Sequence, residues 1–180
     1  MRKKSLKNSK TVLSKFIFFF ILFYIIAIKI LPQSGIYEFF FDRAKYPNLC
    51  VDIDMPINDL NQLSPHTKKL ALKFLQKADE EGLPVEITET YRPQERQNYL
   101  YEKGRTKKGP KVTWTKHSKH TDRRAFDIKK RGKDPYGDDE FFKRCAEIGK
   151  EIGLTPGYYF KKYQDKPHFE FRAWWLSKNY

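Results

Sequence analysis

Histidine and acidic residues stand close together in two short segments of this chain, the first of which is strongly basic. The chain has four histidines, and two of them, His117 and His120, lie in the segment "TKHSKHTDRRAFDI" shortly before Asp127. Asp165 and His168 occur together in "QDKPHFEF" near the C-terminus. A basic surface needs neither histidine nor carboxylate, whereas imidazole and carboxylate are both good zinc ligands. The spacing therefore predicts a metal site.

Two predicted strands would position these residues. The segments 124–128 and 167–171 alternate between apolar and polar residues, and successive side chains of a strand point to opposite faces. The phenylalanines then face the core, while Asp127 and His168 lie on the polar faces, with His120 in the loop before the first strand. Three protein ligands of this type suit zinc and leave a fourth position for water, which favours catalysis over a structural role.

Several other residues are candidates for roles at such a site. His117 competes with His120 for the metal, whereas His66, near a predicted helix N-terminus, is expected to be structural. A zinc hydrolase needs a general base, and Asp165, three residues before a ligand, could reach the bound water or simply stabilise the turn. Arg92 follows a predicted strand and could stabilise an oxyanion, although most arginines are solvated surface charges.

The segment from about Leu63 to Phe171 resembles the D-Ala-D-Ala metallopeptidase family, which includes zinc DD-carboxypeptidases, dipeptidases and L-alanyl-D-glutamate endopeptidases. The family signature S-x-H-x-x-G-x-A-x-D and a second motif, D-x-P-H-F, both match in register. The matching residues are Ser118, His120, Ala125 and Asp127, followed by Asp165, Pro167, His168 and Phe169. The segment "ITETYRPQERQ" is similar to an upstream part of the family that carries an oxyanion-contacting arginine.

The resemblance implies a single zinc ion held by His120, Asp127 and His168, which decides between His120 and His117. It also implies that Asp165 is the catalytic base, that Arg92 contacts the oxyanion, and that the substrate is a stem peptide of peptidoglycan. The chain departs from the signature at Arg123, where the family has glycine. Ser118 and Arg123 are therefore additional candidates for contacting substrate.

The N-terminus predicts a membrane anchor. Residues 1–11 form a basic flank, and residues 12–32 contain the apolar run "FIFFFILFYIIAI", about as long as a membrane-spanning helix. A secretory signal is the alternative, but no small-x-small cleavage pattern follows the run. Basic residues before the span predict a cytoplasmic N-terminus and a domain on the outer face of the cytoplasmic membrane. A juxtamembrane link over 33–55 and a zinc peptidase domain over 56–180 would follow.

The remaining pattern predicts an α+β fold with a small, mostly antiparallel sheet and flanking helices. Helices are expected from Ser64 to Gly82, from Pro93 to Lys103 and over 138–153. Strands are expected over five short segments, namely 84–88, 111–115, 124–128, 157–163 and 167–171.

The composition leaves open the role of the positive charge, the state of the two cysteines and the function of the chain. The net charge is +14, of which seven basic residues lie before Gly35, so the rest of the chain is at about +7. That excess fits either ordinary solubility or attraction to an anionic partner such as a cell wall. Cys50 and Cys145 could form one disulfide in an exported domain or be buried thiols. Besides the enzyme, the alternatives are a non-catalytic, zinc-containing wall-binding module and a nucleic-acid-binding protein, against which the export signal argues.

Overall fold

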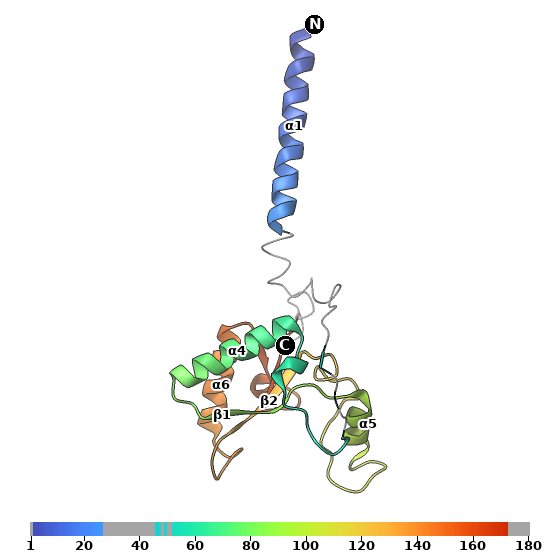
Figure 1. Cartoon of the computed structure of the whole chain (residues 1–180), viewed down its shortest axis with the longest axis vertical. Helices are drawn as coiled ribbons and strands as arrows, with labels where there is room; N and C mark the ends of the chain where they lie inside the picture. Colours follow the sequence, from blue (N-terminus) through green and yellow to red (C-terminus); the bar gives the residue numbers. More distant parts are fainter. Residues whose placement is uncertain (1, 27–45, 48, 50–51, 173–180) are drawn as a thin grey trace. The chain divides into compact units, whose positions relative to one another are not determined.

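The computed structural model describes residues 2–26, 46–47, 49 and 52–172 of the chain. The chain divides into two compact units, residues 1–42 and residues 43–180. The first unit contains the helix α1, Arg2–Ile25, and the second contains all the other helices and strands that the structure describes (Figure 1). We describe each unit by itself.

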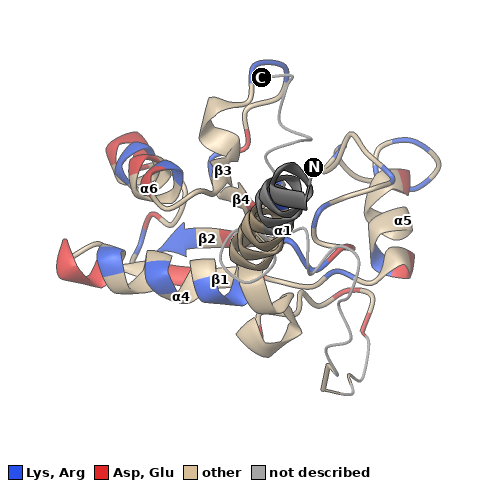
Figure 2. Cartoon of the chain, turned by 90° about the horizontal axis from the view of Figure 1, so that it is seen from above, with Lys and Arg blue, Asp and Glu red and all other residues tan. Residues whose placement is uncertain are grey.

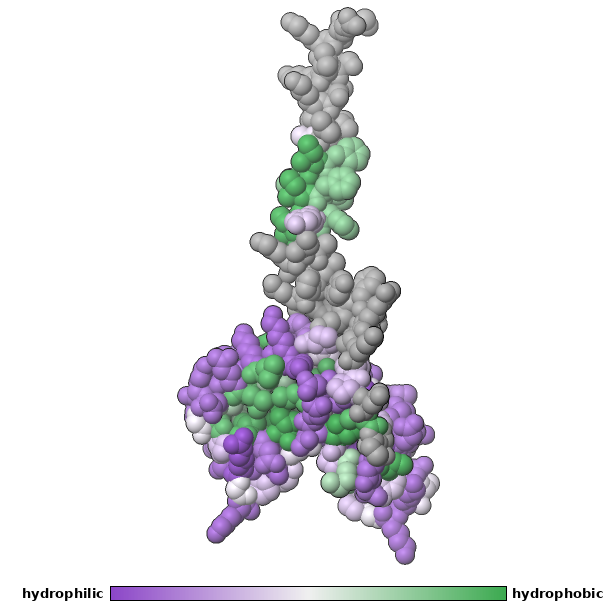
Figure 3. Space-filling view, viewed as in Figure 1, coloured by the Kyte–Doolittle hydropathy of each residue, from purple (hydrophilic) through white to green (hydrophobic). Residues whose placement is uncertain are grey.

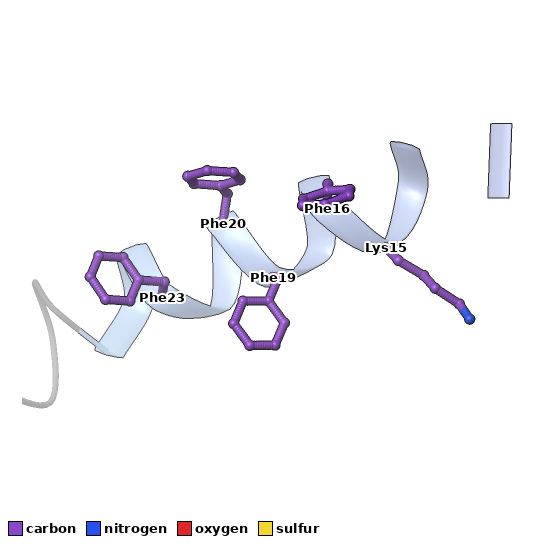
Figure 4. A pocket seen from close by; sticks show the side chains of 5 residues that line it. All are labelled: Lys15, Phe16, Phe19, Phe20 and Phe23. Carbon is purple, nitrogen blue, oxygen red and sulfur yellow. The ribbon is translucent and has the colours of Figure 1, made fainter. Parts of the chain in front are cut away.

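Helix α1 carries a run of exposed hydrophobic side chains. The large apolar residues from Phe16 to Ile26 expose between 38% and 73% of their surface, and this part of the helix is hydrophobic in Figure 3. Figure 4 shows phenylalanines projecting from the helix beside Lys15, with no second polar side chain among the five drawn. None of the described helices combines the length and low polarity that crossing a membrane requires. The predicted transmembrane helix is thus not supported, and residues 27–32 of its span lie outside the described part.

The second unit is built around a four-stranded antiparallel sheet with the order β1-β2-β4-β3. Its strands are β1 (Val85–Glu89), β2 (Ala125–Lys130), β3 (Thr155–Pro156) and β4 (His168–Glu170). The helices are α4 (Pro65–Glu80), α5 (Gln94–Glu102) and α6 (Asp139–Glu151), with short 3-10 helices η2 (Leu60–Gln62) and η3 (Gly157–Tyr159). This confirms the predicted α+β class and the small antiparallel sheet.

The hydrophobic core lies between one face of the sheet and helices α4 and α6. Phe74 of α4 places its ring 4.8 Å from the ring of Phe169 and 5.7 Å from that of Phe126. The predicted apolar stripes of α4 and α6 are largely buried in this core. Figures 1 and 2 both show α5 on the other side of the domain from α6. The other face of the sheet takes no part in this core, and it carries polar side chains.

Two predicted strands are wrong. Residues 111–115 form a loop, because Arg105 and Gln97 donate side-chain hydrogen bonds to the carbonyl groups of Thr113 and Thr115 (3.1 and 2.6 Å), which a strand would use for pairing. The segment 157–163 begins as η3 instead, because the carbonyl oxygen of Gly157 accepts the backbone N–H of residue 160. The strand at this edge of the sheet is the two-residue β3 before it.

Cys145 packs in the core as a buried free thiol, and burial raises its pKa to about 12. Cys50 lies outside the described residues. Cys145 therefore matches the expectation of a small buried apolar residue.

Candidate metal centre

Asp127 and His168 lie directly opposite each other on neighbouring strands. The antiparallel register of β2 and β4 pairs these two residues, and the next pair along the strands is Phe126 with Phe169. Side chains alternate between faces, so the two phenylalanines enter the core while Asp127 and His168 share the other face. Directly opposed residues have their Cβ atoms about 4.5–5.5 Å apart. The sheet itself thus brings two of the predicted ligands together.

His120 reaches the same point from the loop before β2, and the connection between β1 and α5 fixes its ring. Its imidazole is buried, and Nδ1 lies 2.8 Å from the carbonyl oxygen of Thr90. The hydroxyl of Thr90 shares its one proton between the carbonyl oxygens of Ile57 and Asp59, 3.0 and 2.9 Å away, so this acceptor is itself held in place. The backbone N–H of Arg92 donates to the carbonyl of His120. Nε2 of His120 then points to Oδ1 of Asp127, 3.1 Å away.

The hydrogen bonds on the far side of each ring decide which nitrogens carry protons. Nδ1 of His120 faces a carbonyl, and Nε2 of His168 faces a carboxylate oxygen of Glu170 at 3.1 Å; neither acceptor can donate. In neutral rings these nitrogens bear the protons, so Nε2 of His120 and Nδ1 of His168 present lone pairs. Those two atoms are 3.2 Å apart, and Nδ1 of His168 is 3.0 Å from Oδ1 of Asp127. Three electron-pair donors therefore converge on one point.

This donor set fits a metal ion. The three ligand atoms all lie within 4.8 Å of one another, and two imidazole nitrogens with one carboxylate oxygen are donors that zinc accepts. Ligands about 2.0–2.2 Å from a tetrahedral zinc stand roughly 3.3 Å apart, close to the spacing seen here. A cation removes the repulsion between three converging lone pairs, so the geometry accounts for the cluster as a metal centre.

Electrostatics of the cluster agree with a site built to hold positive charge. When no cation is bound, Nδ1 of His168 is protonated as well: burial alone would lower the pKa of His168, but hydrogen bonds to Asp127 and Glu170 outweigh it and raise the pKa to about 10. Burial would likewise raise the pKa of Asp127, but the charges and hydrogen bonds of the two histidines hold it well below its usual range. The ionised form of Asp127 is the form that binds a metal.

Arg92 stands beside the metal centre with its guanidinium already bound. Nη2 donates to buried Glu89 and lies 3.7 Å from Oδ2 of Asp127, and Nη1 donates to the side-chain oxygen of Gln97 at 2.8 Å. The second carboxylate oxygen of Glu89 accepts from Nε of Arg96 at 3.1 Å. Glu89 pairs with Asp127 across β1 and β2, at the end of a bulge. Glu89, at the bulged end of β1, thus holds the guanidinium of Arg92 next to the carboxylate of Asp127.

Asp165 is carried by the turn that leads into β4. Its backbone N–H donates to the carbonyl of Gly157 at 3.0 Å, and its carbonyl accepts from the N–H of His168 at 3.1 Å. A Cβ on Gly157 would lie 2.4 Å from the carbonyl oxygen of Asp165, so only glycine permits this approach. The Asp165 carboxyl lines the same cleft as the three predicted ligands, and burial raises its pKa. A carboxylate with a raised pKa is suited to accept and return a proton.

The cleft at the metal centre has a volume of about 460 Å³. Arg92, Ser118 and His117 line it as well. The Oγ of Ser118 accepts the backbone N–H of His120 at 3.3 Å, which shapes the ligand loop from inside the cleft. His117 lies on the cleft wall but not in the three-residue cluster. His66 is elsewhere, with its ring tilted against that of Phe171 and the two centroids 4.5 Å apart.

Arg123 is not among the residues that line the cleft, and its expected contact with substrate stays a prediction. Its guanidinium lies over the rings of Tyr46 and Tyr91, 3.8 and 3.6 Å from their centroids, and donates to the side chain of Gln62 at 2.5 Å. Its backbone adopts a φ of 60°, which explains why the family signature has glycine at this position. The arginine side chain thus ties the loop to the segments that carry Tyr46, Tyr91 and Gln62.

Taken together, a cleft with three metal donors, an adjacent carboxylate and a neighbouring cation is the type of site that metal-dependent hydrolases use. Residues 60–177 match the family model for VanY, D-alanyl-D-alanine carboxypeptidase. The chain therefore belongs to the VanY family of D-alanyl-D-alanine carboxypeptidases, which confirms the resemblance seen in the motifs.

Individual relatives agree with this assignment. The chain is 33% identical over 130 residues to the peptidoglycan L-alanyl-D-glutamate endopeptidase CwlK of Bacillus subtilis, covering 65% of this chain and 77% of the relative. The crystal structure of the L-Ala D-Glu endopeptidase ChiX of Serratia marcescens is similar in fold, with a TM-score of 0.51 and 19% identity over 67% of this chain and 93% of that one. The LD-carboxypeptidase LdcB has a TM-score of 0.51 and 17% identity, covering 68% and 70% of the two chains.

Four residues that shape the site were not identified from the sequence: Glu89, Thr90, Gly157 and Glu170. A signal existed for Glu170, because strand alternation places it on the same face as His168 two residues earlier. Glu89 and Thr90 act through a bulge and a backbone carbonyl, and neither leaves a pattern in the sequence.

Proposed function

We propose that the domain over residues 56–180 is a zinc-dependent peptidase that hydrolyses a peptide bond in the stem peptides of peptidoglycan. The observation that carries the proposal is the convergence of His120, Asp127 and His168 in a cleft that also contains the carboxyl group of Asp165. Membership of the VanY family and the likeness to an L-alanyl-D-glutamate endopeptidase support the same substrate class. The D-Ala-D-Ala bond and the L-Ala-D-Glu bond are the two candidates for cleavage.

In this proposal the three ligand residues hold one zinc ion. Zinc, when bound, supplies Lewis acidity toward the scissile carbonyl and lowers the pKa of water. His120 and His168 keep their lone pairs aimed at the metal because Thr90 and Glu170 accept the protons of their other nitrogens. Such outer partners fix both the tautomer and the orientation of a ligand ring.

The chemistry left to the chain is proton transfer and charge stabilisation. Asp165 takes a proton from the attacking water and gives it to the leaving amine, a role that its raised pKa and its place in the cleft support. Arg92 supplies a positive charge next to Asp127 for the developing oxyanion. Lys119 and Arg172 also line the cleft and favour the approach of a carboxylate-bearing peptide.

A pair of histidine variants tests the metal assignment. His168→Ala removes one of three ligands and is expected to lose most of the zinc and all measurable hydrolysis of defined stem peptides. His117→Ala, on the same cleft wall, is the matched control and should keep one zinc per domain. If both variants retain one equivalent of zinc after dialysis, the ligand set is wrong. If the wild-type domain binds zinc but cleaves neither candidate bond, the non-catalytic wall-binding module replaces the enzyme.

We also propose that residues 12–32 attach the domain to the outer face of the cytoplasmic membrane. The basic flank over 1–11, the apolar run and the exposed hydrophobic side chains of α1 support this proposal. A reporter active only in the cytoplasm, fused after Tyr180, should be silent, and one active only outside should work. Release of a shortened soluble form would argue for a cleaved signal instead.

A further inference from the structure

Two exposed aromatic rings meet at the rim of the metal-site cleft and take no part in the proposed chemistry. The rings of Trp114 and Tyr163 are stacked, with centroids 4.7 Å apart and planes inclined by 8°. Trp114 remains 53% exposed and Tyr163 44% exposed. Large apolar side chains left in solvent need a reason when they gather in one place. We therefore expect this pair of rings to have a function of its own.

The pair is continuous with the cleft. Trp114 lies between Thr113 and Thr115, both of which line the cleft, and Tyr163 lies between Phe160 and Asp165, which line it as well. The two rings thus join the two segments of chain that form the cleft wall, beside the residues that line it. A substrate that fills the cleft and extends beyond it here passes over the rings.

Cations surround the rings. Lys111 and Arg105 lie over the ring of Trp114 at 5.5 and 5.8 Å, and Lys162 lies over that of Tyr163 at 5.4 Å. The segment from Lys103 to Thr121 carries seven Lys or Arg and no acidic residue, and basic residues are visible in the loops beside α5 in Figure 2. Arg105 is held in place by the carbonyl groups of Tyr101 and Thr113, whereas Lys111 and Lys162 have long flexible side chains that can move to meet a ligand.

We propose that Trp114 and Tyr163, with the cations around them, form a platform that binds the sugar chain to which the stem peptide is attached. A pyranose ring offers an apolar face of C–H groups, which packs on a flat aromatic surface, and an edge of hydroxyl, acetamido and carbonyl oxygens, which accept hydrogen bonds from Lys and Arg. The platform rests on the proposed function, because only a stem peptide in the cleft would bring its sugar chain to this rim.

The platform predicts that the domain distinguishes a stem peptide on a sugar chain from the same peptide without sugar. Trp114→Ala and Tyr163→Ala should each raise the KM for the sugar-linked peptide by about 3- to 10-fold, the scale of one lost aromatic contact. The KM for the sugar-free peptide and both kcat values should stay within about 2-fold of the wild type. Trp114→Phe should restore most of the difference, because it keeps a ring. Leu72→Ala, which alters an exposed residue of α4, is the control.

A binding assay separates this inference from the proposed reaction. Asp165→Asn protein should sediment with glycan chains stripped of their peptides, and Asp165→Asn combined with Trp114→Ala should do so several-fold less. An equal rise in KM for both peptides would show that the ring pair only holds the two loops, and would overturn the platform. Unchanged KM values, or equally tight binding of a single-stranded oligonucleotide, would also overturn it. If the wild type cleaves neither peptide, the proposed function fails, whatever the glycan assay shows.

Discussion

At the scale of single residues, the proposed site separates the groups expected to hold a metal from the group expected to move protons. The carboxyl groups of Asp127 and Asp165 lie near the same two histidines, yet their pKa values are shifted in opposite directions. When no cation is bound, the charges and hydrogen bonds of the protonated histidines keep Asp127 ionised, and a cation held by the same groups would act in the same direction, whereas desolvation favours the neutral form of Asp165. Such a divergence of pKa values is what the proposed division between a metal ligand and an acid–base residue requires.

Asp165→Asn should therefore lower kcat without releasing the metal. The amide keeps the shape of the side chain but cannot accept a proton, and general acid–base catalysis contributes about 10²- to 10⁴-fold. The measurement is turnover of a defined stem peptide with zinc content determined in parallel. In the wild type, activity should rise with pH through a limb that lies above the ordinary aspartate pKa of about 3.9. Near-normal turnover by the variant would remove Asp165 from the mechanism.

Glu170→Gln should weaken zinc binding although the residue does not point at the metal. The charge of Glu170 polarises the imidazole of His168 from behind, and loss of such a partner costs roughly 10- to 100-fold in metal affinity. Competition with a chelating dye measures this directly. Glu86→Gln changes a half-exposed glutamate of β1 that pairs with Lys129 and serves as the matched control. Equal affinities in the two variants would contradict a supporting role for Glu170.

At the scale of elements, sequence periodicity predicted the helices and strands that pack in the core but not the loop at 111–115. The stripes of α4 and α6 and the alternation of β2 and β4 follow from burial, and the structure confirms them. The loop at 111–115 has the composition of a strand, but side chains from Arg105 and Gln97 occupy its carbonyl groups. Such long-range competition for backbone hydrogen bonds cannot be read from a local pattern. The predicted ligands lie in local motifs and could be named from the sequence. Glu89 and Thr90 could not, because their roles depend on contacts with distant segments.

Gly157→Ala tests how closely η3 controls the turn into β4. The added methyl group would meet the carbonyl oxygen of Asp165 and the Cβ of His168, at 2.4 and 3.0 Å. The turn must move, so we expect a loss of at least about 10-fold in kcat/KM together with weaker zinc binding, as small misplacements of catalytic groups are costly. Gly153→Ala is an instructive comparison. Its Cβ meets nothing within 4 Å, but its φ of 92° strains the backbone, so it should lower stability more than activity.

A variant of Gly157 with full activity and full zinc affinity would mean that the turn adjusts freely. The position of Asp165 would then owe little to η3. Thermal unfolding of both glycine variants, measured beside their kinetics, distinguishes local displacement from general destabilisation.

At the scale of the whole domain, the metal should contribute to folding stability. Its ligands come from β2, β4 and the loop before β2, so binding requires the native arrangement of all three. A ligand present at about 100 times its Kd stabilises the native state by roughly 2.7 kcal/mol. Dialysis against a chelator should lower the Tm of the wild type by several degrees and leave that of His168→Ala unchanged. A wild-type Tm insensitive to chelation would indicate that the cluster does not hold a metal.

The pairing of Asp127 with His168 also means that the site forms only in the folded protein. The two residues are 41 positions apart in the chain and meet only when β4 aligns with β2 in one register. A slip of a single residue would turn His168 into the core and bring Phe169 to the cleft. An unfolded or misaligned chain therefore has no assembled centre and cannot cut anything. Hydrolytic activity begins with correct folding, so a wall-degrading enzyme of this design needs no separate inhibitor before it folds.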